Sequence, residues 1–348
     1  MAKNNKRPNP DSLLTIGLDV GYGAVKAVTS DTALVFPSVC GHAREIKFQQ
    51  DEIAERHPGD QIQDDEGRWF VGDLALIQLT PGELLRLRGR TANEDALGNV
   101  FRRRLMKVVI GKLMTGIYDE PVVHIRIASG LPVDHMGDSD DLKAALLGQH
   151  LIKTDTAHLI ANVVEVMVMP QPLGCLYSVI LTPEGEVNRN HIYKRTGVVD
   201  VGTYTVDIAL DDEGEFISAD SGSVEGGVYM AHNHIAAILE KRYRQKMPFK
   251  MIDETLRTGT FRAHGELVDM SAEVEEALAS LRSATLNLIA EMWKSGTGVD
   301  VMLLCGGGAE LVYESVKAAY PQTHLVRDAQ LANARGYLNY ARFKETHS

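Results

Sequence analysis

Two short stretches of this sequence, half a chain apart, place a carboxylate immediately before a glycine-containing turn. They are residues 18–23 (LDVGYG) and 199–204 (VDVGTY). In each, an apolar run ends in an aspartate, Asp19 or Asp200, and a second strand-like run follows the turn. A buried strand would carry the carboxylate at its tip, and the glycine would let the turn present backbone N–H groups to an anion. Two such hairpins facing each other would hold a polyphosphate and its metal ion from both sides.

Asp19 and Asp200 are therefore the candidate metal-binding and catalytic residues. Together they could hold a hydrated Mg²⁺ that bridges phosphate oxygens, because Mg²⁺ keeps several waters and takes few protein ligands. Lys26 follows on the returning strand and would reach the β-phosphate, whereas Asp207, at the corresponding place in the second copy, would suit metal or water. One copy alone would be an ordinary strand-end aspartate that caps a turn. The second copy in a matching context favours a functional pair.

Glycines and turn residues complete the candidate nucleotide contacts. These are Gly21, Tyr22, Gly23, Gly202, Thr203, Tyr204, Gly226, Gly227, Gly306, Gly307 and Gly308. The triple glycine lies between a predicted buried strand and a helix, so its backbone and the helix N-terminus could approach a base and an α-phosphate. The pair at 226–227 is equally typical of a plain helix start. Gln171, between the two halves of the chain, could orient an attacking water or could be an ordinary turn residue.

Composition limits the class of protein. The chain has 348 residues, 44% of them hydrophobic and 24% charged, as in soluble globular proteins of two or three domains. The formal net charge of −11 argues against coating nucleic acid. Three scattered cysteines indicate reduced thiols, and no apolar run is long enough to span a membrane. We expect a cytoplasmic protein that does not bind membranes directly.

Basic residues are concentrated in one part of this acidic chain. They are Arg86, Arg88, Arg90, Arg102, Arg103, Arg104 and Lys107. The set is typical of a solvated helix face, and the alternative is a contact surface for an acidic partner or a neighbouring subunit.

The elements that must position these residues follow one outline twice: three strands, a helix, a strand and a helix. This predicts an α/β fold of two related lobes, each with a mixed sheet, and a ligand cleft between them. Lobe I would span 13–170, with an inserted subdomain at about 37–92, and a C-terminal helix at 327–345 would complete it. Lobe II would span 171–326.

Finer features are also predicted. They are a disordered leader at 1–12, a helix at 93–117, a loop at 129–132, a mobile loop at 183–195 and a long helix at 271–294.

In this order, the motifs resemble those of the actin-like ATPases, and most closely the bacterial ParM-type plasmid-segregation filament proteins. The matching segments are 16–26 and 199–207 for the two phosphate motifs, 169–172 and 330–337 for the two connecting segments, and 304–309 for the adenosine motif. The resemblance implies an actin-like, duplicated ribonuclease H-like fold, with Gln171 positioning the hydrolytic water. One position departs from the pattern, because Tyr22 stands where many relatives carry a Ser or Thr whose hydroxyl meets the γ-phosphate.

The function that this resemblance implies is ATP-dependent filament formation, with ATP hydrolysis controlling polymerisation in plasmid or DNA segregation. The cofactors would be ATP (or GTP) and Mg²⁺. The partners would be other copies of the chain and a DNA-bound adaptor protein. The alternatives on the same fold are a non-polymerising small-molecule kinase and a nucleotide-gated scaffold. For the kinase, Gln171 would be a poor base.

Overall fold

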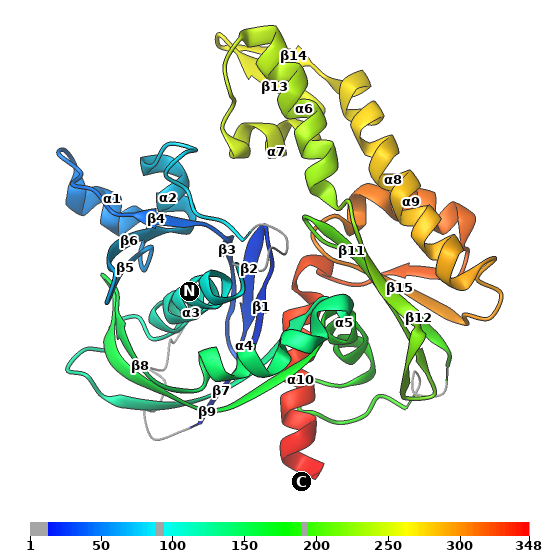
Figure 1. The fold of residues 1–348 in the computed structure, drawn as a ribbon, viewed down its shortest axis with the longest axis horizontal. Coiled ribbons are helices and arrows are strands. Elements are labelled where there is room, and N and C mark those ends of the chain that lie inside the picture. Colours follow the sequence, from blue (N-terminus) through cyan, green and yellow to red (C-terminus); the bar gives the residue numbers. More distant parts are fainter. Residues whose placement is uncertain (1–12, 88–93, 190–193, 348) are drawn as a thin grey trace, which may run out of the picture.

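A six-stranded mixed sheet forms the centre of lobe I (Figure 1). The computed structural model describes residues 13–87, 94–189 and 194–347, so the predicted leader and part of the loop predicted at 183–195 lie outside the described residues. The strand order is β3 (Ala33–Pro37), β2 (Ala24–Val28), β1 (Leu14–Val20), β7 (Val122–Leu131), β9 (His158–Pro170) and β8 (Gly148–Lys153).

A five-stranded sheet forms the centre of lobe II and repeats the first. Its order is β12 (Glu215–Glu225), β11 (Thr205–Asp212), β10 (Thr196–Val201), β15 (Val301–Cys305) and β16 (Thr323–Leu325). In both sheets the first three strands form an antiparallel meander, and the meander's first strand pairs in parallel with the next strand of the sheet. The predicted repetition of one α/β outline is confirmed.

The two hairpins also share their register. In the first, Asp19 pairs with Lys26, and in the second, Asp200 pairs with Asp207. Each aspartate is thus the second-last residue of a central strand, facing the same position of the returning strand. Equivalent residues therefore occupy equivalent places in the two lobes.

Helices cover both faces of each sheet. Lobe I carries α3 (Glu94–Leu113), the short η1 (Val133–Asp138) and α4 (Ser139–Leu146), and Figure 1 shows β7, β8 and β9 curving around α3. Lobe II carries α6 (Val228–Tyr243), α8 (Ser271–Trp293) and α9 (Ala309–Ala319). The helices predicted at 93–117 and 271–294 are confirmed. No helix among the described residues combines the length and apolarity that a membrane crossing requires.

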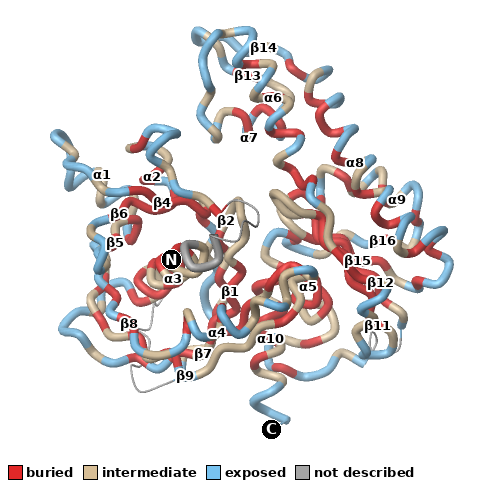
Figure 2. Tube along the Cα trace, viewed as in Figure 1, coloured by how far each residue is buried: buried red, intermediate tan, exposed pale blue. Residues whose placement is uncertain are grey.

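Strand β10 shows how one strand serves two cores, because successive side chains point to opposite faces. Val199 and Val201 pack with α6, α8 and α9, whereas Val198 packs against α5 (Gln171–Ile180). Figure 2 shows the buried residues following the sheets and the inner faces of the helices. The ends of such a strand are held rigidly, and Asp200 is at one of these ends.

Each lobe carries a small outer subdomain. In lobe I it contains α1 (Gln50–Arg56), α2 (Gly72–Gln78) and the sheet β4 (Cys40–His42), β6 (Gly67–Val71) and β5 (Gln61–Asp64). In lobe II it contains α7 (Phe249–Thr258) and the hairpin β13 (Thr260–Ala263) and β14 (Glu266–Asp269). The sequence analysis missed the second one, because its strands are only four residues long and half of their residues are polar.

The prediction of a loop at 129–132 is wrong for residues 129–131, which belong to a strand. Ser129, Gly130 and Leu131 continue β7 and pair in parallel with β9 as far as Pro170. The serine and glycine suggested a turn, but a long neighbouring strand offers their backbone groups hydrogen-bond partners and extends the sheet to the edge of the cleft.

The last helix, α10 (Ala332–His347), follows η2 (Ala329–Leu331) and packs against both α5 and the first sheet along β1 (Figure 1). Glycines permit the close approach. A Cβ on Gly336 would overlap the carbonyl oxygen of Gly174 in α5, and one on Gly17 in β1 would overlap the carbonyl oxygen of Ala334. The chain therefore crosses between the lobes twice at one tightly packed point.

Candidate functional site

The two hairpin turns line one pocket between the lobes. Each turn is closed by the same backbone bond, from Gly21 N to Ala24 O at 3.2 Å and from Gly202 N to Thr205 O at 2.9 Å. Ten of the predicted site residues line this pocket: Asp19, Gly21, Tyr22, Lys26, Gln171, Asp200, Gly202, Thr203, Gly306 and Gly307. Four separate segments of the sequence thus meet at one place.

Asp19 is buried and engaged on both oxygens. Lys26 Nζ donates to Asp19 Oδ2 at 2.9 Å, and Gln171 Nε2 lies 3.4 Å from Oδ1. Burial acts to lower the pKa of Lys26, but the charges of Asp19 and Asp200 outweigh it and raise that pKa above its ordinary value. The lysine therefore stays a cation, and the glutamine is held beside a candidate metal-binding carboxylate.

Asp200 is 2% exposed, and Asn333 Nδ2 donates to its Oδ2 at 2.7 Å. Burial, then the charges of Asp207 and Asp19, raise the pKa of Asp200 to about 7, against the opposing effects of Lys26 and Asn333. Negative charge is thus in excess around this carboxylate, which is an environment that favours a bound cation.

Asp207 differs from the expectation that it would serve metal or water, because it lies outside the pocket lining. It accepts hydrogen bonds from Thr205 Oγ1 at 2.7 Å, from Ser223 Oγ and from the backbone N–H of Val133 in η1. Since η1 belongs to lobe I, the buried Asp207 carboxylate joins the two lobes.

Mg²⁺ fits the donors present here. Among the described residues, no group of three or more His, Cys, Asp and Glu side chains could hold a metal by itself. Two buried carboxylates that face a phosphate site are what Mg²⁺ uses when waters and phosphate oxygens complete its coordination. Asp19 and Asp200 would hold the ion through its waters, since lysine, glutamine and asparagine side chains already engage their oxygens.

The hairpin tips touch in this structure. A Cβ on Gly23 would overlap Thr203 of the other hairpin, and the rings of Tyr22 and Tyr204 meet edge to face with centroids 5.3 Å apart. The pocket behind them has a volume of about 60 Å³, well below the roughly 300 to 1,000 Å³ of ordinary ligand sites. A nucleotide would have to separate the hairpins to enter.

Five predicted contacts lie elsewhere. Tyr204, Gly226 and Gly227 line a neighbouring pocket of about 610 Å³, together with Tyr22 and Tyr229. Gly23 and Gly308 line neither pocket but allow close packing, the latter against Val201 and Val228.

Asn333 and Tyr337 were not singled out from the sequence, and Arg102 was named there only as a member of the basic concentration. Tyr337 is fully buried, and its hydroxyl lies 3.3 Å from the carbonyl oxygen of Gln171. Asn333 and Tyr337 fall within the second connecting segment, so the motif was noticed without their roles. Only the tertiary structure brings Arg102 to the cleft, from the middle of α3.

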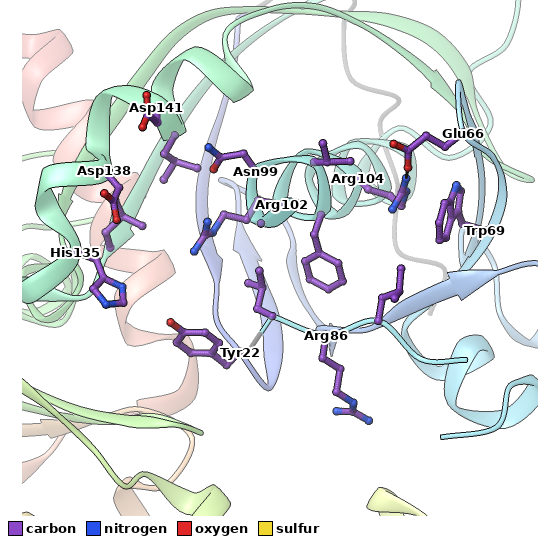
Figure 3. A pocket seen from close by; sticks show the side chains of 17 residues that line it. Tyr22, Glu66, Trp69, Arg86, Asn99, Arg102, Arg104, His135, Asp138 and Asp141 are labelled. Carbon is purple, nitrogen blue, oxygen red and sulfur yellow. Dashed lines mark hydrogen bonds and ion pairs between the residues drawn. The ribbon is translucent and has the colours of Figure 1, made fainter. Parts of the chain in front are cut away.

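The fold places the members of the basic concentration in different environments. Arg104 is buried, forms ion pairs with Asp64 and Glu66 at 2.7 Å each, and lies 3.6 Å over the Trp69 ring. Arg86, Arg102 and Arg104 line a lobe I pocket of about 250 Å³ that adjoins the hairpin pocket (Figure 3). The buried Arg104 is therefore not on a solvated face. The partner surface stays a prediction, and residues 88 and 90 lie outside the described residues.

Fold and site together define a class of protein: a two-lobed α/β protein in which duplicated acidic hairpins face each other across a cleft. The family model "Actin like proteins N terminal domain" matches residues 17–174, and "Archaeal actin homologue MreB-like, C-terminal" matches residues 198–318. The chain belongs to the actin-like superfamily.

Individual relatives are distant in sequence. An archaeal actin homolog of Thermoplasma volcanium is 23% identical, and the match covers 94% of this chain and 99% of that protein. The structure resembles a 15-stranded ParM filament from Clostridium botulinum, with a TM-score of 0.78 and 21% identity over 95% of this chain and 99% of that one. It also resembles an archaeal actin homolog in complex with ADP, with a TM-score of 0.72 and 18% identity over 94% and 99%.

Proposed function

We propose that this protein binds ATP with Mg²⁺ between its lobes, hydrolyses it, and assembles into filaments of identical subunits under the control of the bound nucleotide. The observation that carries the proposal is the convergence of Asp19, Lys26, Gln171 and Asp200 on one interlobe pocket. The ADP complex of an archaeal relative and the ParM filament support it. The role we propose is plasmid or DNA segregation in the cytoplasm, through a DNA-bound adaptor.

The chemistry would depend on position and charge. Lys26 and the backbone N–H groups of the turns would bind phosphate oxygens, and Gln171 would orient a water for in-line attack on the γ-phosphate. When bound, Mg²⁺ would neutralise part of the phosphate charge. GTP is an alternative substrate for the same groups.

We assign 13–170 and 327–345 to one lobe and 171–326 to the other. Nucleotide bound between them would favour one relative position of the lobes and therefore one geometry of the surfaces that meet in a filament. Hydrolysis would remove the γ-phosphate contacts and weaken that preference.

Sedimentation and electron microscopy with and without nucleotide test this function. We expect pelleted protein and visible filaments with ATP and Mg²⁺, and a marked reduction with EDTA or with an Asp200→Asn variant. Arg262→Ala, an exposed substitution in the outer subdomain of lobe II, gives the matched control for nucleotide binding and ATP turnover. The absence of nucleotide-dependent assembly over a wide concentration range would contradict the proposal.

A further inference from the structure

Arg102 lies on the wall that separates the hairpin pocket from the larger lobe I pocket, and it lines both. Its side chain runs back along α3, because Nη1 would lie 3.3 Å from a Cβ built on Gly98, one helical turn earlier. Figure 3 shows the guanidinium pointing from α3 toward the side of the pocket that carries Tyr22 and His135. Helix α3 thus places the positively charged Arg102 side chain at the cleft.

We propose that Arg102 contacts the terminal phosphate of the nucleoside triphosphate, an inference that rests on the function proposed above. The direction of the nucleotide follows from the two walls. Gly306 and Gly307 line the lobe II wall, where the base and α-phosphate are expected, whereas Arg102 enters from lobe I with Tyr22 and Leu131. The phosphate farthest from the base would then be the one nearest Arg102.

The charge balance of the pocket supports this assignment. Among the described residues that line it, Lys26 and Arg102 are the cations and Asp19 and Asp200 the anions, so the lining is neutral overall. A triphosphate with Mg²⁺ adds about two negative charges, and phosphoryl transfer needs that charge neutralised. Arg102 is the second cation that the lining offers.

The side chain at position 22 supports it further. The ring of Tyr22 is packed edge to face on Tyr204, so position 22 places an aromatic ring rather than a short hydroxyl at the first hairpin turn. A guanidinium offers planar, paired donors that match phosphate oxygens and keeps its charge at any physiological pH. Arg102 would therefore supply a side-chain contact to the γ-phosphate from the lobe I wall.

The neighbouring arginine provides a matched control. Arg103 lines neither pocket and lies near His150, whose pKa is lowered first by burial and also by the charges of Lys107 and Arg103. It carries the same charge as Arg102 and lies on the same helix, but it does not line the cleft. A general effect of removing a positive charge from α3 would appear in both variants.

The experiment measures the affinities of a non-hydrolysable ATP analogue and of ADP, each with Mg²⁺, by calorimetry on unassembled wild-type protein and on Arg102→Gln, Arg102→Lys and Arg103→Gln. We expect Arg102→Gln to weaken binding of the triphosphate about 10- to 100-fold, the loss of one charge-assisted contact, and ADP binding by less than about threefold. Arg102→Lys should lose less affinity for the triphosphate, because lysine keeps the positive charge but lacks the paired N–H donors of the guanidinium. Arg103→Gln should match the wild type with both nucleotides.

Equal losses for triphosphate and diphosphate, or an Arg102→Gln variant that matches Arg103→Gln, would overturn the inference while leaving the proposed function in place. A wild type that binds neither nucleotide would overturn both. Circular dichroism of each variant checks its folding, and if Arg102→Gln does not fold, the triphosphate-to-diphosphate ratio of Arg102→Lys decides.

Discussion

At the scale of single residues, the site depends on side chains that position the groups bearing the chemistry. Asn333 and Tyr337 are four residues apart on α10 and therefore share one helix face. The first donates to Asp200 and the second contacts the carbonyl oxygen of Gln171. The orientation of Asn333 is itself fixed, because Cys305 Sγ lies 3.9 Å from its Oδ1. Helix α10 thus holds both Asp200, the proposed metal-binding residue, and Gln171, the proposed water-orienting residue.

Asn333→Ala should reduce the contribution of Mg²⁺ to nucleotide binding. Without its donor, the Asp200 carboxylate loses its fixed orientation, so we expect about a 10-fold smaller gain in affinity on adding Mg²⁺. Affinity measured in EDTA should change little. Titration calorimetry with and without Mg²⁺ gives both values.

The matched control is Asn339→Ala, on the same helix. Asn339 is also buried and donates to the backbone of Leu181 at 3.0 Å, away from the pocket. Both variants should lose about 1 to 3 kcal/mol of folding free energy. If both also change the Mg²⁺ dependence equally, the role given to Asn333 is wrong.

At the scale of elements, the crossing of α5 and α10 connects the two lobes. Both elements lead directly to the site, since α5 begins at Gln171 and α10 carries Asn333. Their contact is made by backbone, with Gly336 against Gly174. Packing of this kind leaves no flexible side chain that could move to relieve an added atom.

Gly336→Ala should therefore destabilise the protein by about 3 kcal/mol, because the new methyl group meets a carbonyl of α5 and the helices must separate. Chemical denaturation measures the change. Gly298→Ala is the control, since a Cβ there meets open space and its backbone is not in the left-handed region. A Gly336→Ala protein as stable as this control would show that the crossing is loose.

At the scale of the whole molecule, the lobes touch at the hairpin tips and again at the mouth of the cleft. There the Arg86 guanidinium of lobe I lies 5.0 Å from the centre of the Phe249 ring of lobe II. His232 stacks on the same ring at 4.0 Å and supports it from α6. Since the pocket below holds about 60 Å³, nucleotide exchange requires these contacts to open.

Arg86→Ala should speed the release of bound nucleotide about two- to fivefold, which corresponds to the loss of one cation–π contact. Phe249→Leu should act in the same direction, because it removes the ring from the other lobe. Stopped-flow release of a fluorescent nucleotide measures the rate, with Arg262→Ala as the control. Unchanged release in both cleft variants would show that the mouth does not limit exchange.

The sequence by itself determined the repeated α/β outline, the two hairpins and the residues at their tips. Local patterns suffice for these features, since Asp19 and Asp200 each follow an apolar strand and precede a glycine turn within a few residues. The extension of β7 through Leu131 was missed because its partner strand lies some 40 residues away along the chain. Short strands such as β13 and β14 gave too weak a local signal, because each has only four residues.

Only the tertiary structure decided which side chains meet. Arg102 lines the cleft, although its neighbours in sequence face the lobe I core or His150. Asp207 connects the two lobes by a hydrogen bond and does not line the pocket. Asn333 donates a hydrogen bond to Asp200, which lies 133 positions away in the sequence. Distances of this kind depend on how the helices cross and the sheets curl, and those follow from the packing of the whole chain rather than from any local pattern.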